Sequence, residues 1–68
     1  MPQGVNKNQK LADAAFKVVV KSEQFNTANQ ILNAALALAK AGHARAGLKG
    51  PGPNALNVLG AAGRHYKF

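Results

Sequence analysis

The first helical pattern covers residues 7–22, KNQKLADAAFKVVVKS, where lysines and apolar residues recur with a period of about 3.6. At about 100° per residue, the four lysines fall within an arc of about 80°, and the apolar residues occupy the other sides. Three consecutive valines in FKVVVK also favour a short strand, but the lysine spacing fits only the helical period. The pattern therefore predicts a helix with a lysine stripe, made of Lys7, Lys10, Lys17 and Lys21.

A second helix is predicted within FNTANQILNAALALAKAG, residues 25–42. Asn26 or Thr27 can serve as its N-cap, and Gly42 is a typical C-terminal stop. The short connection SEQFN joins the two helices, so residues 7–42 are predicted to form an antiparallel helical hairpin. The broad apolar face of the second helix comprises Ala28, Ile31, Leu32, Ala35, Leu36, Leu38 and Ala39.

Glycine and proline interrupt the pattern in residues 43–53, which are predicted to form a basic linker with no structure of its own. A short third helix can follow from Asn54, its N-cap, although Gly60 and Gly63 weaken its last turn. The residues RHYKF then form a basic and aromatic tail within the last segment, 54–68. Residues 1–6 are predicted to be a flexible or extended arm.

These patterns define an all-α fold class: a small helical hairpin of two helices, with or without a short third helix, and an extended Gly/Pro-rich C-terminal arm. The 68 residues allow one small domain. The apolar fraction is 47%, but fourteen of these residues are alanine, which adds little side-chain area. A core this thin predicts that the chain gains its order by association with larger protein subunits or with further copies of itself.

Charge is the strongest global feature, because nine Lys and Arg residues face only two carboxylate side chains, for a net charge of +7. Asp13 and Glu23 both lie in the first third, which leaves five cations and no carboxylate side chain in residues 24–68. Such an excess predicts an anionic partner, such as nucleic acid, an acidic protein surface or a membrane. The candidate anion-binding residues are Lys7, Lys10, Lys17, Lys21, Arg45, Lys49, Arg64 and Lys67.

Large apolar side chains on the second and third helices and in the tail are the candidate contacts to a protein partner. Tyr66 also fits a second interpretation, in which it stacks on an unpaired base. Pocket filling by the terminal Phe68 is the favoured interpretation of the tail. The candidate partner-interface residues are Ile31, Leu32, Leu36, Leu38, Leu56, Leu59, Tyr66 and Phe68.

Catalytic and cofactor patterns are missing from the sequence. Ser22 and Thr27 lack the surroundings of an activated nucleophile, and the two carboxylates lie ten residues apart on a lysine-rich segment. His43 and His65 lie far apart without cysteine, which makes a poor metal site. The glycines of GLKGPGPN lack the spacing of a phosphate-binding loop, and its prolines remove backbone donors. The sequence therefore predicts a protein without enzymatic activity, cofactor or metal.

The polar N-terminus lacks the features of a secretory signal. The longest uncharged stretch, residues 24–39, is too short and polar to span a bilayer. The chain is therefore expected in a virion or a cytoplasmic assembly, without export by a signal peptide.

Together these features favour a structural subunit of a large assembly, such as a minor, cementing or internal virion protein. The second interpretation is a free-standing, nonspecific nucleic-acid-binding protein. A third is a membrane-active basic amphipathic peptide, in which Phe16 and the lysine stripe of residues 7–22 meet the lipid surface.

Overall fold

Three α-helices form the fold in the computed structural model, which describes residues 7–67: α1 (Lys7–Ser22), α2 (Ala28–Arg45) and α3 (Ala55–Tyr66). These residues contain no strand, so the predicted all-α fold is confirmed, and the FKVVVK segment is helical. The predicted N-terminal arm and Phe68 lie outside the described residues.

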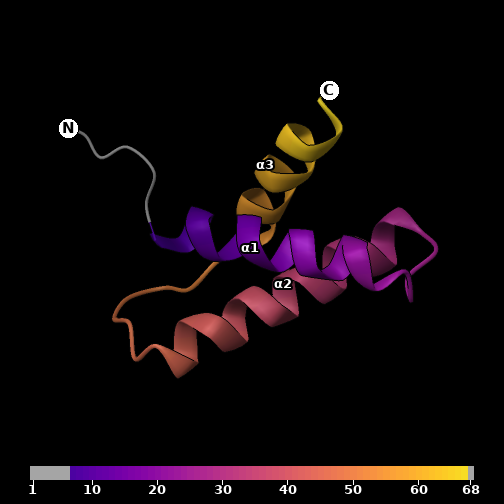
Figure 1. Cartoon of the computed structure of the whole chain (residues 1–68). Coiled ribbons are helices and arrows are strands. Elements are labelled where there is room, and N and C mark those ends of the chain that lie inside the picture. The colour runs from indigo at the N-terminus through magenta and orange to yellow at the C-terminus, as the bar shows by residue number, and fades with distance from the viewer. Residues whose placement is uncertain (1–6, 68) are drawn as a thin grey trace.

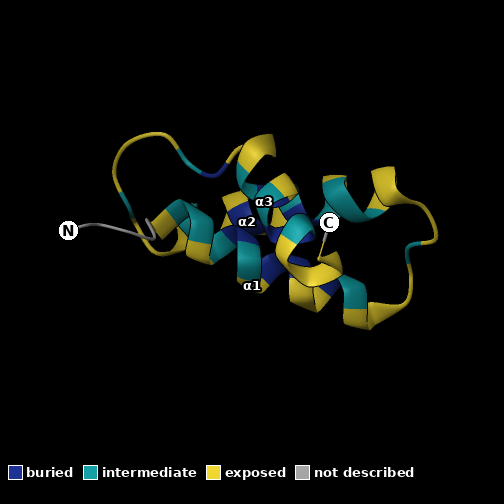
Figure 2. Ribbon diagram, turned by 90° about the horizontal axis from the view of Figure 1, so that it is seen from above, coloured by how far each residue is buried: buried dark blue, intermediate teal, exposed yellow. Residues whose placement is uncertain are grey.

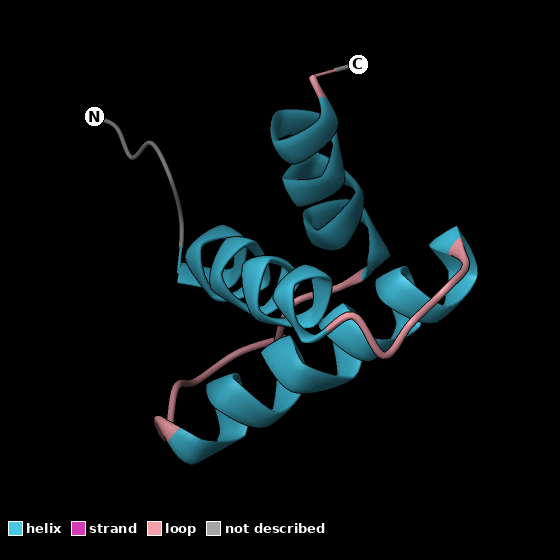
Figure 3. Cartoon of the chain, turned by 45° about the vertical axis from the view of Figure 1, so that its right-hand side comes forward, coloured by secondary structure: helices cyan, strands magenta, loops and turns pink. Residues whose placement is uncertain are grey.

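The central helix is α1, which packs against both of the others, whereas α2 and α3 share the smallest contact. The α1–α2 pair forms the predicted hairpin, and α3 stands steeply across it (Figures 1 and 3). Buried residues gather where the three helices cross, and the helix ends are more exposed (Figure 2). The core therefore occupies one crossing region and does not extend along the full length of any helix.

Small side chains dominate this core, since six of its nine buried residues are alanine. Phe16 and Val58 are the largest fully buried side chains of the helices. Alanine leaves little volume between two helices, so their backbones approach closely, and Phe16 fills the space that remains. The nine residues are Ala12, Ala15, Phe16, Val19, Ala35, Ala39, Val58, Ala61 and Ala62.

Both α2 and α3 begin with a capping box, in which two side chains satisfy each other's backbone amides. Thr27 is the N-cap of α2, and its hydroxyl oxygen accepts a hydrogen bond from the Gln30 backbone amide at 3.2 Å. Asn54, the predicted N-cap of α3, pairs in the same way with Asn57. These caps explain why both helices start where they do.

The predicted end of α2 at Gly42 is wrong, because the helix continues to Arg45. Gly47, with φ of 69°, takes the left-handed position after the cap, and its amide donates to the Ala44 carbonyl. The next amide, that of Leu48, donates to the His43 carbonyl, which completes a Schellman motif. Gly42 instead permits close packing, since a Cβ there would lie 3.3 Å from Leu11 Cδ2.

The Gly/Pro-rich segment therefore begins later than predicted and makes contacts of its own. The Asn8 side-chain amide donates to the Pro51 carbonyl at 2.9 Å. Gly52 lies against the His43 ring, and Pro53 is fully buried. The prediction that this segment has no structure of its own is wrong, because α1 and α2 provide a surface for it within the chain.

The third helix also extends further than the sequence pattern suggests. It passes through Gly60 and Gly63, so that Arg64, His65 and Tyr66 are helical and do not belong to an extended tail. Aromatic contacts stabilise this last turn: the Phe16 ring lies 5.6 Å from the His65 ring and 5.8 Å from the Tyr66 ring, centroid to centroid.

Overpacking the helix crossing tests the importance of its small residues. Ala35→Leu places a large side chain at a fully buried position, and we expect a loss of about 1–3 kcal/mol in the free energy of unfolding. The matched control Ala37→Leu, at an exposed position of the same helix, is expected to change it by less than about 0.5 kcal/mol. Urea unfolding followed by circular dichroism measures both; equal losses would contradict the close-packed crossing.

Gly47→Ala tests the Schellman motif, because a Cβ at Gly47 meets no atom within 4 Å and only the left-handed backbone is strained. We expect a loss of about 1–2 kcal/mol in the free energy of unfolding. Gly47→Asn is the control and should lose less, since asparagine tolerates this conformation better. Chemical denaturation of the three proteins provides the comparison, and an unchanged Gly47→Ala midpoint would argue against the motif.

Candidate functional site

The exposed cations are the first candidate surface. All eight predicted anion-binding residues are exposed to solvent. Among the described residues, only Arg64 forms an ion pair with a carboxylate. The remaining seven therefore keep their charges uncompensated by any described carboxylate, and each is accessible to an anionic partner.

One depression brings together two lysines that are distant in the sequence. Lys7 at the start of α1, His43 near the end of α2 and Lys49 in the connecting loop line a hollow of about 590 Å³. Asn8 and Pro51, the pair joined by the loop hydrogen bond, lie in the same wall. This basic depression depends on the internally anchored loop, because the loop carries Lys49.

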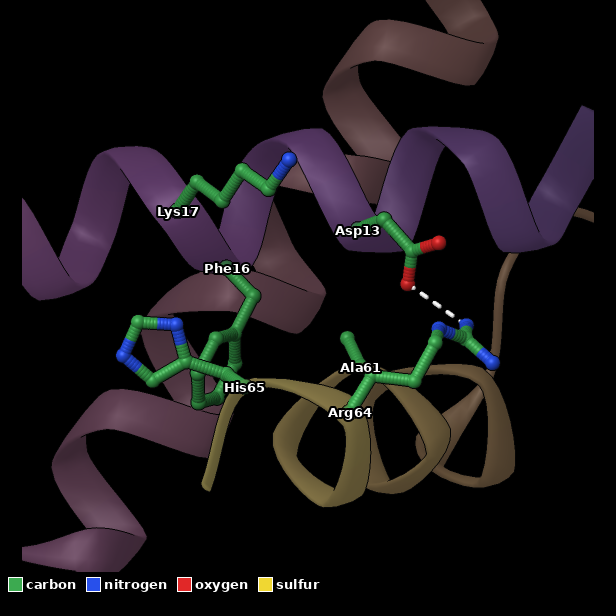
Figure 4. A pocket seen from close by; sticks show the side chains of 6 residues that line it. All are labelled: Asp13, Phe16, Lys17, Ala61, Arg64 and His65. Atoms are coloured by element: carbon green, nitrogen blue, oxygen red, sulfur yellow. Dashed lines mark hydrogen bonds and ion pairs between the residues drawn. The ribbon is translucent and has the colours of Figure 1, made fainter. Parts of the chain in front are cut away.

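A second depression, of about 410 Å³, lies between α1 and α3 and contains Lys17 and Arg64 (Figure 4). Its charge is partly neutralised, since Asp13 and Arg64 point toward each other with Oδ1 and the guanidinium nitrogen 2.8 Å apart. The other predicted cations, Lys10, Lys21, Arg45 and Lys67, line neither of these depressions.

The Asp13–Arg64 pair belongs to a polar network that joins α1 to α3. The Gln9 side-chain amide donates to Asp13 Oδ1 at 3.0 Å and to the Asn57 carbonyl at 2.8 Å. In return, the Asn57 side-chain amide donates to Gln9 Oε1 at 3.2 Å. We call Gln9, Asp13, Asn57 and Arg64 the α1–α3 polar clamp.

This clamp was not predicted from the sequence. Residues 24–68 contain no carboxylate side chain. Because α3 crosses α1, however, Arg64 of α3 meets Asp13 of α1. Four-residue spacing places Gln9 and Asp13 on one face of α1, which is the only local signal of the clamp. Arg64 is thus a structural residue as well as a candidate anion contact.

The second candidate surface is an apolar groove between α2 and α3. Two adjoining hollows, of about 250 and 170 Å³, share Leu32 and Leu59. No residue that lines either hollow carries a charge. We call this surface the α2–α3 groove; five predicted partner-interface residues line it: Ile31, Leu32, Leu36, Leu59 and Tyr66.

The groove exists because α3 packs mainly on α1 and leaves the facing sides of α2 and α3 only partly covered. Leu59 and Tyr66 remain 48% and 51% exposed at its edge. Leu38 and Leu56 are also exposed, but they do not line the groove. Continuous apolar surface of this kind is typical of interaction sites.

The residues considered for catalysis have structural contacts. The Ser22 hydroxyl donates to the Val19 carbonyl at 2.8 Å, and Thr27 caps α2. His43 packs on the loop and His65 on Phe16. Residues 7–67 contain no group of three or more histidine, cysteine or acidic side chains arranged to hold a metal ion.

Within the same residues, no helix has both the length and the apolar character that a membrane crossing requires. No protein-family model matches the chain, and neither does a curated protein sequence or a solved structure. Functional inference therefore rests on the two surfaces themselves.

Gln9→Ala tests the clamp, because it removes the partner of both the Asn57 carbonyl and the Asn57 side-chain amide. These part-buried groups would lose hydrogen bonds, so we expect a loss of about 1–2 kcal/mol in the free energy of unfolding. Lys10→Ala, at the next, exposed position of α1, should change it by less than about 0.5 kcal/mol. Thermal and urea unfolding measure the difference; a stable Gln9→Ala protein would show that the clamp contributes little.

Proposed function

We propose that the chain is a small, non-enzymatic accessory subunit of a larger assembly, in which it contacts an anionic surface and a protein neighbour. The observation that carries this proposal is that the two surfaces have different linings: the basic depressions hold Lys7, Lys17, Lys49 and Arg64, whereas no charged residue lines the α2–α3 groove. A virion, where small basic proteins lie between larger subunits and packaged nucleic acid, is one assembly that offers both neighbours.

Phosphate groups are the anions that the basic surface suits best. Lysines dominate it, and their flexible ammonium groups bind phosphates as point charges without reading base edges. The basic depression adds Lys7 and Lys49 from two segments at one place. Binding through such contacts is salt-dependent and indifferent to sequence.

A free-standing nucleic-acid-binding protein is the second candidate, and the anchored loop favours it. The contacts of Pro51, Gly52 and Pro53 hold the loop without a partner chain. Lys49 is therefore presented by the folded monomer, so this part of the basic surface needs no neighbouring subunit for its assembly.

A salt titration separates the two candidates. We expect a labelled DNA duplex of about two helical turns to bind with a Kd of about 10⁻⁴ to 10⁻⁶ M near physiological salt, the range of nonspecific contacts, and to weaken steeply as salt rises. Sub-micromolar binding by the chain alone would instead support the free-standing protein. Fluorescence anisotropy measures both, and no binding at low salt would refute the anionic contact.

Single lysine variants locate the contact. Lys49→Ala should reduce the slope of log K against log salt concentration by about 0.9 if one phosphate contact is lost. Lys40→Ala removes the same charge from an exposed position outside the basic depression and is the matched control. Equal reductions for the two variants would show that only net charge matters.

A further inference from the structure

The basic depression contains one side chain whose charge is not fixed. His43, near the end of α2, lines it together with Lys7 of α1 and Lys49 of the loop. The histidine is only partly buried, so a ligand in the depression has access to it. Histidine is the side chain that changes its charge between about pH 5 and 8. The depression therefore holds two fixed cations and one position that becomes a third when the pH falls.

We propose that the basic depression is a phosphate-binding subsite that becomes stronger as the pH falls, because protonated His43 adds a positive charge beside Lys7 and Lys49. The ligand is a phosphate group, in a nucleic-acid backbone or as a free oxyanion. Both nitrogens of a protonated ring donate, so His43 can bind an oxyanion through a charge-assisted hydrogen bond. The inference rests on the proposed anionic contact and names its place and its regulation.

Tertiary contacts hold the segments that build the depression. The Asn8 side chain attaches the first turn of α1 to the loop through the Pro51 carbonyl. Gly52 lies against the histidine ring, since a Cβ there would be 3.4 Å from both Cγ and Nδ1 of His43. Lys49 directly follows the Schellman motif at the end of α2. The chain is thus held on both sides of Lys49, and the depression belongs to the folded monomer.

Neither carboxylate side chain of residues 7–67 lines the basic depression. Asp13 lines the second depression, where it pairs with Arg64 (Figure 4). Glu23 follows the opposite end of α1 from Lys7. A phosphate in the basic depression therefore meets positive side chains without a carboxylate in the same lining, whereas one in the second depression meets Asp13.

Two helix ends of opposite polarity also meet at this depression. The first turn of α1 lines it and contains no acidic side chain, so the positive end of the helix dipole favours an anion there. The last carbonyls of α2 would repel an anion, but those of Gly42, His43 and Ala44 already accept hydrogen bonds from the amides of residues 46–48. What remains of this negative end favours a proton on His43, which lies in the last turn of α2.

The charged groups around His43 come from three elements. Lys7 of α1 and Lys49 of the loop share the depression with it, and Lys40 and Arg45 are its charged neighbours on α2. No residue of α3 lines the depression. All four groups are cations, so they oppose a charge on the ring while the site is empty. A bound phosphate compensates this repulsion, and binding of the proton and of the phosphate therefore strengthen each other.

Duplex binding at two pH values is the first test, because phosphodiesters keep one negative charge throughout the range. At constant salt concentration, we expect the duplex to bind about threefold to tenfold more tightly at about pH 5.5 than at about pH 8. His43→Gln keeps a polar side chain without the titrating charge and should lose most of this increase. His65→Gln removes the histidine of the second depression and is the matched control, which should keep most of it. Circular dichroism establishes that both variants are folded.

A site-resolved measurement keeps the inference open to refutation if His43→Gln fails to fold. Sulfate, a tetrahedral oxyanion whose charge is constant over the same range, is the probe for the wild-type chain. It should shift the backbone amide resonances of Lys7, Asn8 and residues 47–49 in a saturable way, at lower concentration at about pH 5.5 than at about pH 8. Chloride at equal ionic strength is the control for screening and should not reproduce these shifts.

The outcomes separate this inference from the proposed function. Duplex binding that is equal at the two pH values, or an equal loss of the increase in the two histidine variants, would overturn the pH-dependent subsite and leave the anionic contact in place. Sulfate shifts confined to other residues would have the same meaning. No duplex binding at either pH would refute the anionic contact itself, and the subsite with it.

Discussion

The close approach of three helices at alanine positions around Phe16 is the constraint on which the rest of this structure depends. Six alanines in a core of nine residues leave space for only one large aromatic side chain. Most of the larger apolar residues are therefore only partly buried at the edge of this core, and five among residues 7–67 are exposed. The α2–α3 groove follows from this arrangement, because large apolar residues at the edge of the core line it.

Alanine packing alone leaves the orientation of the helices poorly specified, and polar contacts between the helices fix that orientation. The α1–α3 polar clamp fixes α3 on α1 through directional hydrogen bonds. Asn57 contributes to both the clamp and the α3 capping box, so the start of the helix and its docking are coupled. The Asn8–Pro51 hydrogen bond likewise attaches the loop that leads into α3 to the start of α1.

Much of this fold could be predicted from local patterns, and the misses share one physical cause. Periodicity and capping residues were enough to predict the helical hairpin, as well as Asn54 as the start of α3. Gly42 is a typical helix end in the sequence pattern. Its actual role, close packing against Leu11, is a tertiary contact that a single sequence does not reveal. The persistence of α3 through two glycines likewise depends on the contact of Phe16 with its last turn.

The candidate surfaces follow the same rule. Apolar character alone was enough to predict five of the groove residues as contacts to a partner. That they lie together depends on the convergence of one face of α2 with one face of α3. The convergence of Lys7 with Lys49, and of Asp13 with Arg64, required the path of the chain after α2. Pairings between residues more than forty positions apart carry no local signature, so they could not be predicted.

Tyr66 has a further consequence for this molecule, because the chain contains one tyrosine and no tryptophan. Its ring meets Phe16 edge-on and borders the groove. The ultraviolet emission of the chain therefore originates almost entirely from one point, where core and surface meet. A natural optical reporter is thus built into the molecule, sensitive both to loosening of the last turn of α3 and to whatever comes to lie beside it.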